Sequence, residues 1–407
     1  MNHCDKPGLR SVEEALEQLL QSAGITVGTQ RVALSEALGR VLACDLLSSV
    51  DVPPAANSAM DGYCLRYEDF KAGTQYQVSQ RIPAGTAPQP LQSGTLARIF
   101  TGAELPANAD TVVMQEDVTA TEAGVVINTF VKQGQNVRPM GQDIRQGQVA
   151  LAKGSRIRPQ EMGLLASVGV AEVEVYAPLR VAILSTGDEL VEPGNPLQPG
   201  QIYNSNRYTL IGLLKGLGMD ILDLGIVPDD LEQTESAFIR AAAEADVIIS
   251  SGGVSVGEED HIRAMLEKLG QLAFWKLAIK PGKPFAFGSI METPFVGLPG
   301  NPAAVFVTFA LLVRPWLLKM QGATQYLAQE VMVPAAFSTR KAGGRQDYLR
   351  ARLVASESGN KVEIYPNQSS GMLSSASWGN GFAVIPPGEV VVEGDPVRFL
   401  LFDTVLN

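Results

Sequence analysis

The first 178 residues combine two kinds of hydrophobic pattern. Residues 11–23 carry apolar side chains at helical spacing behind a capping box formed by Ser11 and Glu14. A second helix is predicted near residues 35–43, and Pro159 suits the first turn of a third. Between them, short β-type runs alternate with turns and show no helical period. We therefore expect a β-rich domain, residues 51–143, inserted into a discontinuous helical domain, residues 8–50 and 144–178, whose helices pack together.

From residue 179 the chain alternates strand-like and helix-like segments. The runs RVAILS, DILDLGIV and DVIISS, within residues 180–251, are apolar in the way that buried parallel strands require. A long, nearly all-apolar helix is predicted over residues 303–320. This alternation predicts a doubly wound, mostly parallel α/β sheet domain over residues 179–327. In such a sheet, ligands bind outside the carboxyl ends of the strands.

The remaining residues, 328–407, return to a β pattern. Short runs such as YLRARLVA and PVRFLLF are separated by turn signals, which predicts a small C-terminal β-barrel or sandwich. The predicted fold class is therefore multidomain α/β plus β.

Composition and charge narrow the class of protein. The 407 residues are 45% hydrophobic and 18% charged, as in a folded chain, and the net charge of -11 argues against a general nucleic-acid partner. Three cysteines without CxxC spacing and two histidines disfavour a disulfide framework, a zinc site and histidine triads. The N-terminus has no apolar signal-peptide core, and the run 303–313 is too short to span a bilayer. We expect a soluble cytoplasmic protein without a membrane partner.

Polar turns follow the predicted strands of the sheet domain. The turns TGDE, SGGVSVG and KPGK, within residues 186–283, offer backbone N–H groups and lysines that suit an oxyanion. Glu189 and Asp260 add the hard oxygen ligands that Mg²⁺ prefers. The turn SGGVSVG lacks both the GK[ST] of a P-loop and the GxGxxG spacing, so ATP hydrolysis and nicotinamide binding lose support. A phosphate-type ligand with Mg²⁺ is the resulting hypothesis.

Structural explanations compete with this hypothesis at several positions. An Asp before a helix is a good N-cap, so at least one of Asp229 and Asp230 is expected to be a cap. Asp260 is expected in the first turn of a helix, where the dipole favours a negative charge. Lys276 is harder to explain structurally, because an unpaired ammonium would be costly inside the apolar strand WKLAI.

Taken together, the motifs resemble those of the MoeA/gephyrin E-domain family, the molybdenum insertases. The resemblance rests on NSAMDGY, TGA, VVMQE, STGDEL, SGGVSVGEED, KLAIKPGKP and GLPGNP, which occur in family order. It implies Mg²⁺-dependent insertion of molybdate into adenylyl-molybdopterin with release of AMP. It also implies a homodimer whose cleft is shared between subunits, with dimerisation through the discontinuous domain, and contact with other enzymes of molybdenum cofactor biosynthesis.

The resemblance also assigns roles to residues. The implied catalytic residues are Asp61, Asp143, Lys276, Lys280 and Lys283, and the implied Mg²⁺ ligands are Glu189, Asp229 and Asp260. The implied substrate-binding residues are Thr101, Ser251, Gly252, Gly253, Ser255, Pro299, Asn301, Pro302, Arg350 and Ser374. Two alternatives remain open, namely a molybdopterin adenylyltransferase built on a similar sheet domain and a non-catalytic scaffold like that of gephyrin.

Overall fold

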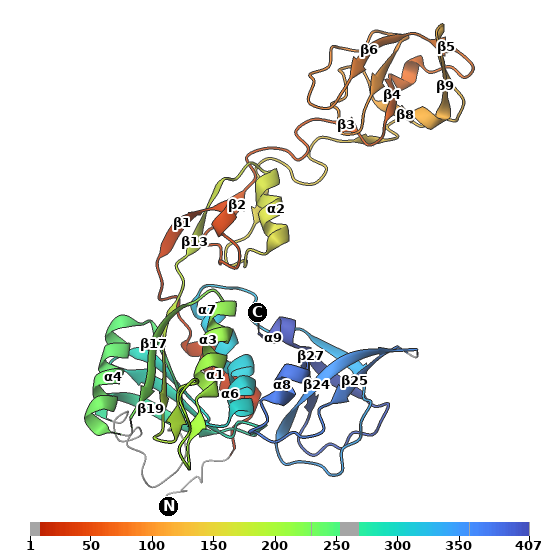
Figure 1. Ribbon diagram of the computed structural model, residues 1–407. Coiled ribbons are helices and arrows are strands. Elements are labelled where there is room, and N and C mark those ends of the chain that lie inside the picture. Colours follow the sequence, from red (N-terminus) through yellow and green to blue (C-terminus); the bar gives the residue numbers. More distant parts are fainter. Residues whose placement is uncertain (1–8, 229, 253–267, 358, 407) are drawn as a thin grey trace, which may run out of the picture.

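The computed structural model describes residues 9–228, 230–252, 268–357 and 359–406. The chain forms an elongated body (Figure 1). The insert lies at one end, and the sheet domain and the C-terminal domain lie side by side at the other. A small middle domain, built from segments before and after the insert, connects the two ends.

The sheet domain is built on a six-stranded sheet in the order β17-β14-β18-β22-β21-β19. Its first four strands are parallel, and β21 and β19 are antiparallel to their neighbours. The strands are β17 (Asp220–Val227), β14 (Arg180–Thr186), β18 (Val247–Ser251), β22 (Thr293–Leu298), β21 (Pro284–Ile290) and β19 (Gly270–Lys276). Because β17 and β18 flank β14 on opposite sides, the chain order reverses there, and the carboxyl ends of the strands at such a point are where ligands of this kind of sheet bind.

Helices cover both faces of this sheet. On one face, Val181 and Ile249 pack in a core that includes α1 (Val12–Ser22), α3 (Ser205–Gly216) and the helix of residues 302–320. On the other face, Ala182 and Ile248 pack against α4 (Leu231–Glu244). Consecutive strand residues thus enter opposite cores, which is why these strands are apolar throughout. The structure confirms the predicted doubly wound, mostly parallel sheet.

The helix of residues 302–320 is a core element. It consists of α6 (Pro302–Thr308), a π-helical turn η4 (Phe309–Val313) and α7 (Arg314–Met320). Pro315 has no N–H to donate, and the wider π turn accommodates its ring. The helix is long and apolar enough to cross a membrane, but its apolar stretch is 89% buried inside the protein.

Helix α1 packs differently from the prediction. Its capping box is present, with Ser11 and Glu14 bonded reciprocally. Its buried face, which includes Ala15 and Leu19, lies against η4 and α7 of the sheet domain. The prediction that it pairs with the helix after Pro159 is wrong, because the apolar surface of the 302–320 helix accepts its apolar stripe instead.

The middle domain is mostly extended chain. It contains the pair β1 (Thr29–Ala33) and β13 (Glu172–Tyr176), the pair β2 (Leu46–Leu47) and β12 (Val149–Leu151), and α2 (Pro159–Ser167). The helix predicted near residues 35–43 is wrong. Only a 3-10 turn, η1 (Leu34–Glu36), forms there, and Gly39 then adopts a φ of 77°, which no α-helix continues.

The insert is β-rich, as predicted. One sheet contains β6 (Val78–Ile82), β7 (Leu96–Ile99), β4 (Gly62–Leu65) and β8 (Thr111–Met114). A second contains β5 (Gln75–Tyr76), β10 (Gly124–Ile127) and β9 (Val118–Thr121), and a short pair joins β3 (Asn57–Ser58) to β11 (Val137–Arg138). Cys64 and Leu65 enter different cores, so both faces of β4 are buried.

The C-terminal domain is the predicted small barrel. Its strands are β23 (Glu330–Pro334), β24 (Gln346–Ser356), β25 (Gly359–Ile364), β26 (Gly381–Ile385) and β27 (Pro396–Leu401). The ladder closes because the Ala336 N–H, just after β23, donates to the Val362 carbonyl of β25 at 2.8 Å. A two-residue strand of the sheet domain, β20 (Ile279–Lys280), joins the same sheet beside β24.

Candidate functional site

The carboxyl edge of the sheet brings several predicted site residues together. Ser251 ends β18 beside β14, and its hydroxyl lies 3.0 Å from that of Ser185. Gly252 follows with a φ of 92°, and a Cβ there would lie 2.8 Å from the Thr186 carbonyl oxygen. Only glycine allows this close approach of the two chains. Gly253 and Ser255 lie outside the described residues.

Buried polar atoms lie near these strand ends on both faces of the sheet. Thr186 Oγ1, Ser250 Oγ and Asn204 Nδ2 are buried without a hydrogen-bond partner in the described part of the chain. Asn204 is at the same time the N-cap of α3, since its side chain accepts from the Arg207 N–H at 3.2 Å. Buried polar groups normally have partners. The carboxyl edge of the sheet therefore retains hydrogen-bonding capacity on both faces.

Glu189 is the Mg²⁺ candidate that the described residues contain. It is exposed on the turn after β14. Gly187 has a φ of 136°, and a Cβ there would lie 2.4 Å from Glu189 Oε2, so the carboxylate folds back over the turn. Asp229 and Asp260 lie outside the described residues. Within the described ranges, no three His, Cys, Asp or Glu side chains gather into a metal-binding group.

Asp230 has the structural role that was predicted for one member of its pair. It is the N-cap of α4, and its carboxylate accepts from the Gln233 N–H at 2.9 Å. The cap prediction is confirmed for Asp230.

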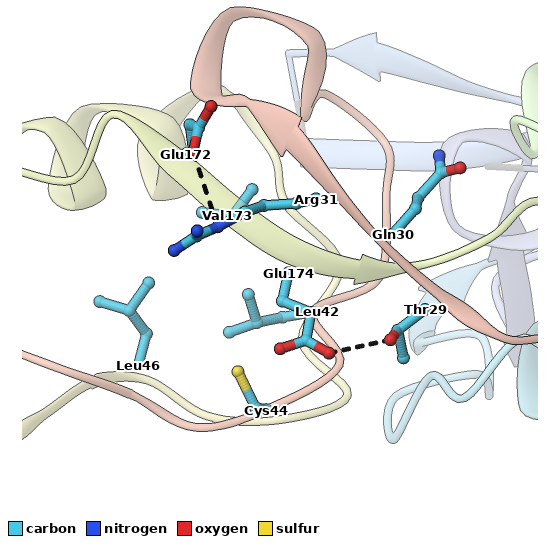
Figure 2. A pocket seen from close by; sticks show the side chains of 9 residues that line it. All are labelled: Thr29, Gln30, Arg31, Leu42, Cys44, Leu46, Glu172, Val173 and Glu174. Atoms are coloured by element: carbon cyan, nitrogen blue, oxygen red, sulfur yellow. Dashed lines mark hydrogen bonds and ion pairs between the residues drawn. The ribbon is translucent and has the colours of Figure 1, made fainter.

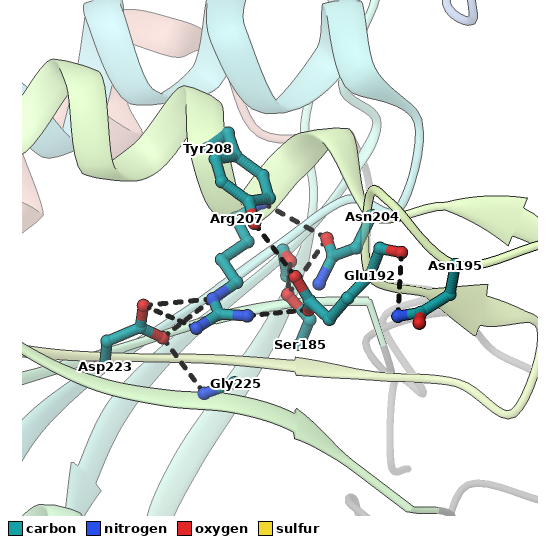
Figure 3. Close-up of polar contacts among 9 residues, drawn as sticks. Ser185, Glu192, Asn195, Asn204, Arg207, Tyr208, Asp223 and Gly225 are labelled. Atoms are coloured by element: carbon teal, nitrogen blue, oxygen red, sulfur yellow. Dashed lines mark hydrogen bonds and ion pairs between the residues drawn. The ribbon is translucent and has the colours of Figure 1, made fainter.

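A polar network anchors the segment that follows Glu189 (Figure 3). Arg207 of α3 forms ion pairs with Glu192 at 2.7 Å and with Asp223 of β17 at 2.9 Å. The Tyr208 hydroxyl donates to the same Glu192 at 3.1 Å. Hydrogen bonding to Asp223, followed by that to Glu192, raises the pKa of Arg207. Sequence reasoning missed Arg207, because its partners come from two other elements.

The lysine turn, residues 280–283, lies at the same edge of the sheet. β19 runs in the same direction as β22, so its end and the start of β21 share the carboxyl edge. Lys280 Nζ lies 2.7 Å from Asp347 Oδ2 of β24, and Lys283 is exposed. Lys276 ends β19 with an exposed side chain. The ammonium therefore pays no burial cost, and the argument from an apolar strand does not apply to it.

The GLPGNP segment, residues 297–302, joins three elements at the carboxyl end of β22. Pro299 is buried, Asn301 is exposed, and Pro302 is the first residue of α6. The Gly300 carbonyl accepts from Asn206 Nδ2 of α3 at 2.8 Å. The segment thus connects β22, α3 and α6 beside the lysine turn.

Arg350 is hydrogen-bonded through its side chain to the loop of residues 369–375 in the C-terminal domain. Its side chain is fully buried, and Nε donates to Ser375 Oγ at 2.9 Å, while Nη2 donates to the Ser369 carbonyl at 3.1 Å. Burial lowers the pKa of Arg350 to about 10. Ser374, the first residue of α8 (Ser374–Trp378), is exposed. Of these two predicted substrate contacts, Ser374 is the one whose side chain reaches solvent.

The site residues predicted in the insert form a separate group. The Asp61 carboxylate accepts from the Thr101 N–H at 2.7 Å and from its hydroxyl at 2.8 Å. These two hydrogen bonds lower the pKa of Asp61. Arg98, which adds a smaller electrostatic contribution, stacks 4.7 Å from the centre of the Phe100 ring. The two hydrogen bonds from Thr101 fix the orientation of the Asp61 carboxylate next to the end of β7.

This group does not meet the sheet-domain residues within one chain. Asp143 is exposed at the base of the insert, where its N–H donates to the Val52 carbonyl at 2.9 Å. The insert and the sheet domain occupy opposite ends of the body (Figure 1). A single chain therefore holds two separate parts of the predicted site.

The middle domain contains a cavity of about 430 Å³ (Figure 2). An ion pair between Arg31 and Glu172, at 3.6 Å, and a hydrogen bond from Thr29 to Glu174, at 2.8 Å, lie at its rim. The lining residues are Thr29, Gln30, Arg31, Leu42, Cys44, Leu46, Glu172, Val173 and Glu174. It contains none of the predicted site residues.

Comparisons with known families cover most of the chain. Residues 10–169 match the model described as the MoeA N-terminal region, domains I and II. Residues 182–319 match a probable molybdopterin binding domain, and residues 332–402 match the MoeA C-terminal region, domain IV.

Individual relatives agree with these matches. A Haemophilus influenzae protein named molybdopterin molybdenumtransferase is 42% identical over 382 residues, which cover 92% of this chain and 94% of the relative. A Nostoc protein of the same name is 38% identical over 95% of this chain and 91% of its own length. A solved structure of the molybdopterin biosynthesis MoeA protein from Pyrococcus horikoshii superposes with a TM-score of 0.82 at 30% identity, covering 97% of this chain and 100% of that one.

Proposed function

The chain belongs to the MoeA family and is a transferase of molybdenum cofactor biosynthesis, and we propose that it inserts molybdate into adenylyl-molybdopterin with Mg²⁺, releasing AMP. One observation carries the proposal. The carboxyl edge of the sheet combines the exposed carboxylate of Glu189 with three exposed lysines, Lys276, Lys280 and Lys283. Hard oxygen and ammonium groups are the types of ligand that a divalent cation and two anions require.

The lysines would hold the oxyanion. Lys280 and Lys283 are exposed on one turn, and an ammonium there offers several N–H donors to molybdate oxygens. This arrangement catalyses by positioning and electrostatics, so it needs no protein nucleophile.

The acidic residues would hold Mg²⁺. Glu189 fits this role, because its carboxylate is exposed and lies on the turn after β14. Asp229 and Asp260 are the other two proposed ligands, on the strength of the motif resemblance. When bound, Mg²⁺ supplies positive charge to the phosphate of the departing AMP.

A second copy of the chain would complete the site. The insert, which contains Asp61 and Thr101, lies at the opposite end of the elongated chain from the sheet domain (Figure 1). A symmetric homodimer can place the insert of one subunit over the sheet domain of the other. We propose that Asp61, Thr101 and Asp143 contact the substrate in this way, and that the dimer is cytoplasmic and works with other enzymes of the pathway.

An AMP-release assay tests the proposal. Purified protein is mixed with adenylyl-molybdopterin, and AMP is measured with and without molybdate and Mg²⁺. Release that requires both additions is expected. No release at any molybdate concentration would refute the insertase function.

The metal assignment has its own test. Asp229→Asn and Asp260→Asn are expected to lose Mg²⁺-dependent release while the oligomeric state, followed by light scattering, stays unchanged. The matched control is Asp230→Asn, next to Asp229, because the Asp230 carboxylate caps α4. Normal turnover in both Asp229→Asn and Asp260→Asn would show that the metal assignment is incorrect.

A further inference from the structure

The lysine turn is attached to two domains. β20 pairs in parallel with β24 of the C-terminal barrel, so that Lys280 lies opposite Asp347. The Arg345 side chain, from the residue before β24, donates to the Ile279 carbonyl at 3.0 Å. The backbone around Lys280 is therefore fixed relative to the C-terminal domain.

The rest of the turn is equally constrained. The Leu277 N–H donates to the Lys283 carbonyl at 2.7 Å, which closes the turn. Gly282 has a φ of 114°, and a Cβ there would lie 2.5 Å from the Thr308 methyl of α6. Because the backbone is held on both sides, the remaining freedom of Lys280 is the rotamer freedom of its side chain.

Asp347 restricts the rotamers of the Lys280 side chain. The distance from Lys280 Nζ to Asp347 Oδ2 is 2.7 Å. The Lys280 side chain is 51% exposed and the Asp347 side chain is 22% exposed, so the carboxylate lies behind the ammonium. A lysine ammonium has three N–H donors, and this bond uses one of them. The other donors remain available at the solvent side.

We propose that Asp347 is a positioning residue that orients the Lys280 ammonium toward the oxyanion substrate. The proposal rests on the proposed function, because it assumes that Lys280 binds molybdate. A free lysine side chain has high rotamer entropy, and an anion that binds it must overcome the loss of that entropy. Asp347 fixes the side chain before the anion arrives. The C-terminal barrel would in this way prepare the anion site of the sheet domain.

The negative charge of Asp347 opposes molybdate binding, whereas its positioning of Lys280 favours binding. A carboxylate near a dianion repels it, so removing the charge alone would lower the KM for molybdate. Solvent screens this repulsion because half of the Lys280 side chain is exposed. Positioning and repulsion therefore predict opposite signs for the change in KM, and the sign distinguishes them.

Steady-state AMP release at varied molybdate concentration tests the proposal. Asp347→Ala is expected to raise the KM for molybdate by roughly three- to ten-fold, the scale of one preorganised side chain, with a smaller change in kcat. Lys280→Ala is expected to raise it as well. The double variant should be no worse than Lys280→Ala, because Asp347 acts through Lys280.

A second ion pair on β24 provides the control. Glu363→Ala breaks the pair with Arg352, whose atoms lie 2.9 Å apart, and the structure gives this pair no contact with the lysine turn. Its KM is expected to match the wild type. Should Asp347→Ala not fold, Asp347→Asn keeps the shape but replaces the charge-assisted hydrogen bond with a weaker one. A smaller rise in KM is then expected, because the weaker restraint on Lys280 outweighs the loss of a repulsion that solvent screens.

Three results would overturn the proposal. They are a lower KM in Asp347→Ala, an unchanged KM, and a further loss when Asp347→Ala is added to Lys280→Ala. If the wild type releases no AMP, the proposed function fails separately. Calorimetric titration of each protein with molybdate alone then decides the role of Asp347, and weaker binding by Asp347→Ala is the expected result.

Discussion

Gly282 is the residue of the lysine turn with the least room for a side chain. Its φ of 114° is a conformation that L-residues rarely adopt, and a Cβ would lie 2.5 Å from Thr308 Cγ2. We predict that Gly282→Ala destabilises the sheet domain for two reasons. The backbone strain costs about 1–3 kcal/mol, and forcing a methyl into a packed site costs about 1–3 kcal/mol. The sum is about 2–6 kcal/mol, a large share of a typical domain stability.

A second substitution separates the two contributions. Thr308→Ser removes the methyl that the new Cβ would meet and keeps the hydroxyl, which donates to the Ala304 carbonyl at 2.7 Å. Alone, it should cost about 1 kcal/mol for the lost buried methyl. Combined with Gly282→Ala, it should recover about 1–3 kcal/mol, because the steric contribution disappears and the backbone strain remains.

Urea unfolding followed by tryptophan fluorescence measures these changes. Trp275 and Trp316 are both buried in the core of the sheet domain, so their emission reports on that domain. A matched control is Gly344→Ala, at a glycine where a Cβ would meet nothing within 4 Å. Stability unchanged by Gly282→Ala, or strictly additive effects in the double variant, would refute the steric argument.

Three further predictions concern charges and caps. Thr101→Val should raise the pKa of Asp61 toward its usual range, because one of its two hydrogen bonds is lost; carbon NMR titration measures this, and an unmoved pKa would contradict the assignment. Since the pKa of Asp61 is lowered in the folded state, the stability it contributes is present above its unfolded pKa and is lost as pH falls through the folded value. Arg207→Gln should destabilise the sheet domain by about 1–3 kcal/mol by leaving Glu192 and Asp223 without their cation, whereas Arg207→Lys, which keeps the charge, should recover part of this loss; thermal melts of both variants measure it, and equal melting temperatures would argue against charge. Asp230→Ala should cost about 1 kcal/mol through loss of the α4 cap, whereas Asp230→Ser should restore most of it; equal urea midpoints for the two variants would exclude the capping role.

Local patterns account for the elements that were predicted correctly. The runs that became β14, β17 and β18 are apolar because both faces of the sheet are covered, and that requirement is visible in the sequence. The capping box at Ser11 and the cap at Asp230 are also local, since each carboxylate or hydroxyl bonds within three residues. Motif resemblance then supplied the residues at the carboxyl edge.

Long-range contacts account for what could not be predicted. Lys280 and Asp347 are 67 residues apart in the chain, and nothing near either one indicates the other. The burial of Arg350 depends likewise on a distant partner, since its side chain donates to Ser375, which lies 25 residues further along the chain. The packing of α1 also depends on distant residues, because α1 contacts η4 and α7, which lie about 300 residues further along the chain.

The connection between the insert and the middle domain has a consequence for how the chain can be cut. The two strands that enter and leave the insert are hydrogen-bonded to each other, since the Val52 N–H donates to the Ile144 carbonyl at 2.8 Å. Ends held this close can be rejoined by a short turn. The chain can therefore be engineered as two separable modules, with the residues between Val52 and Ile144 excised as one piece. Such a shortened protein would lack Asp61 and Asp143 but keep the sheet and the barrel. Mixing it with full-length chains would test whether the insert of one chain can act on the sheet domain of another.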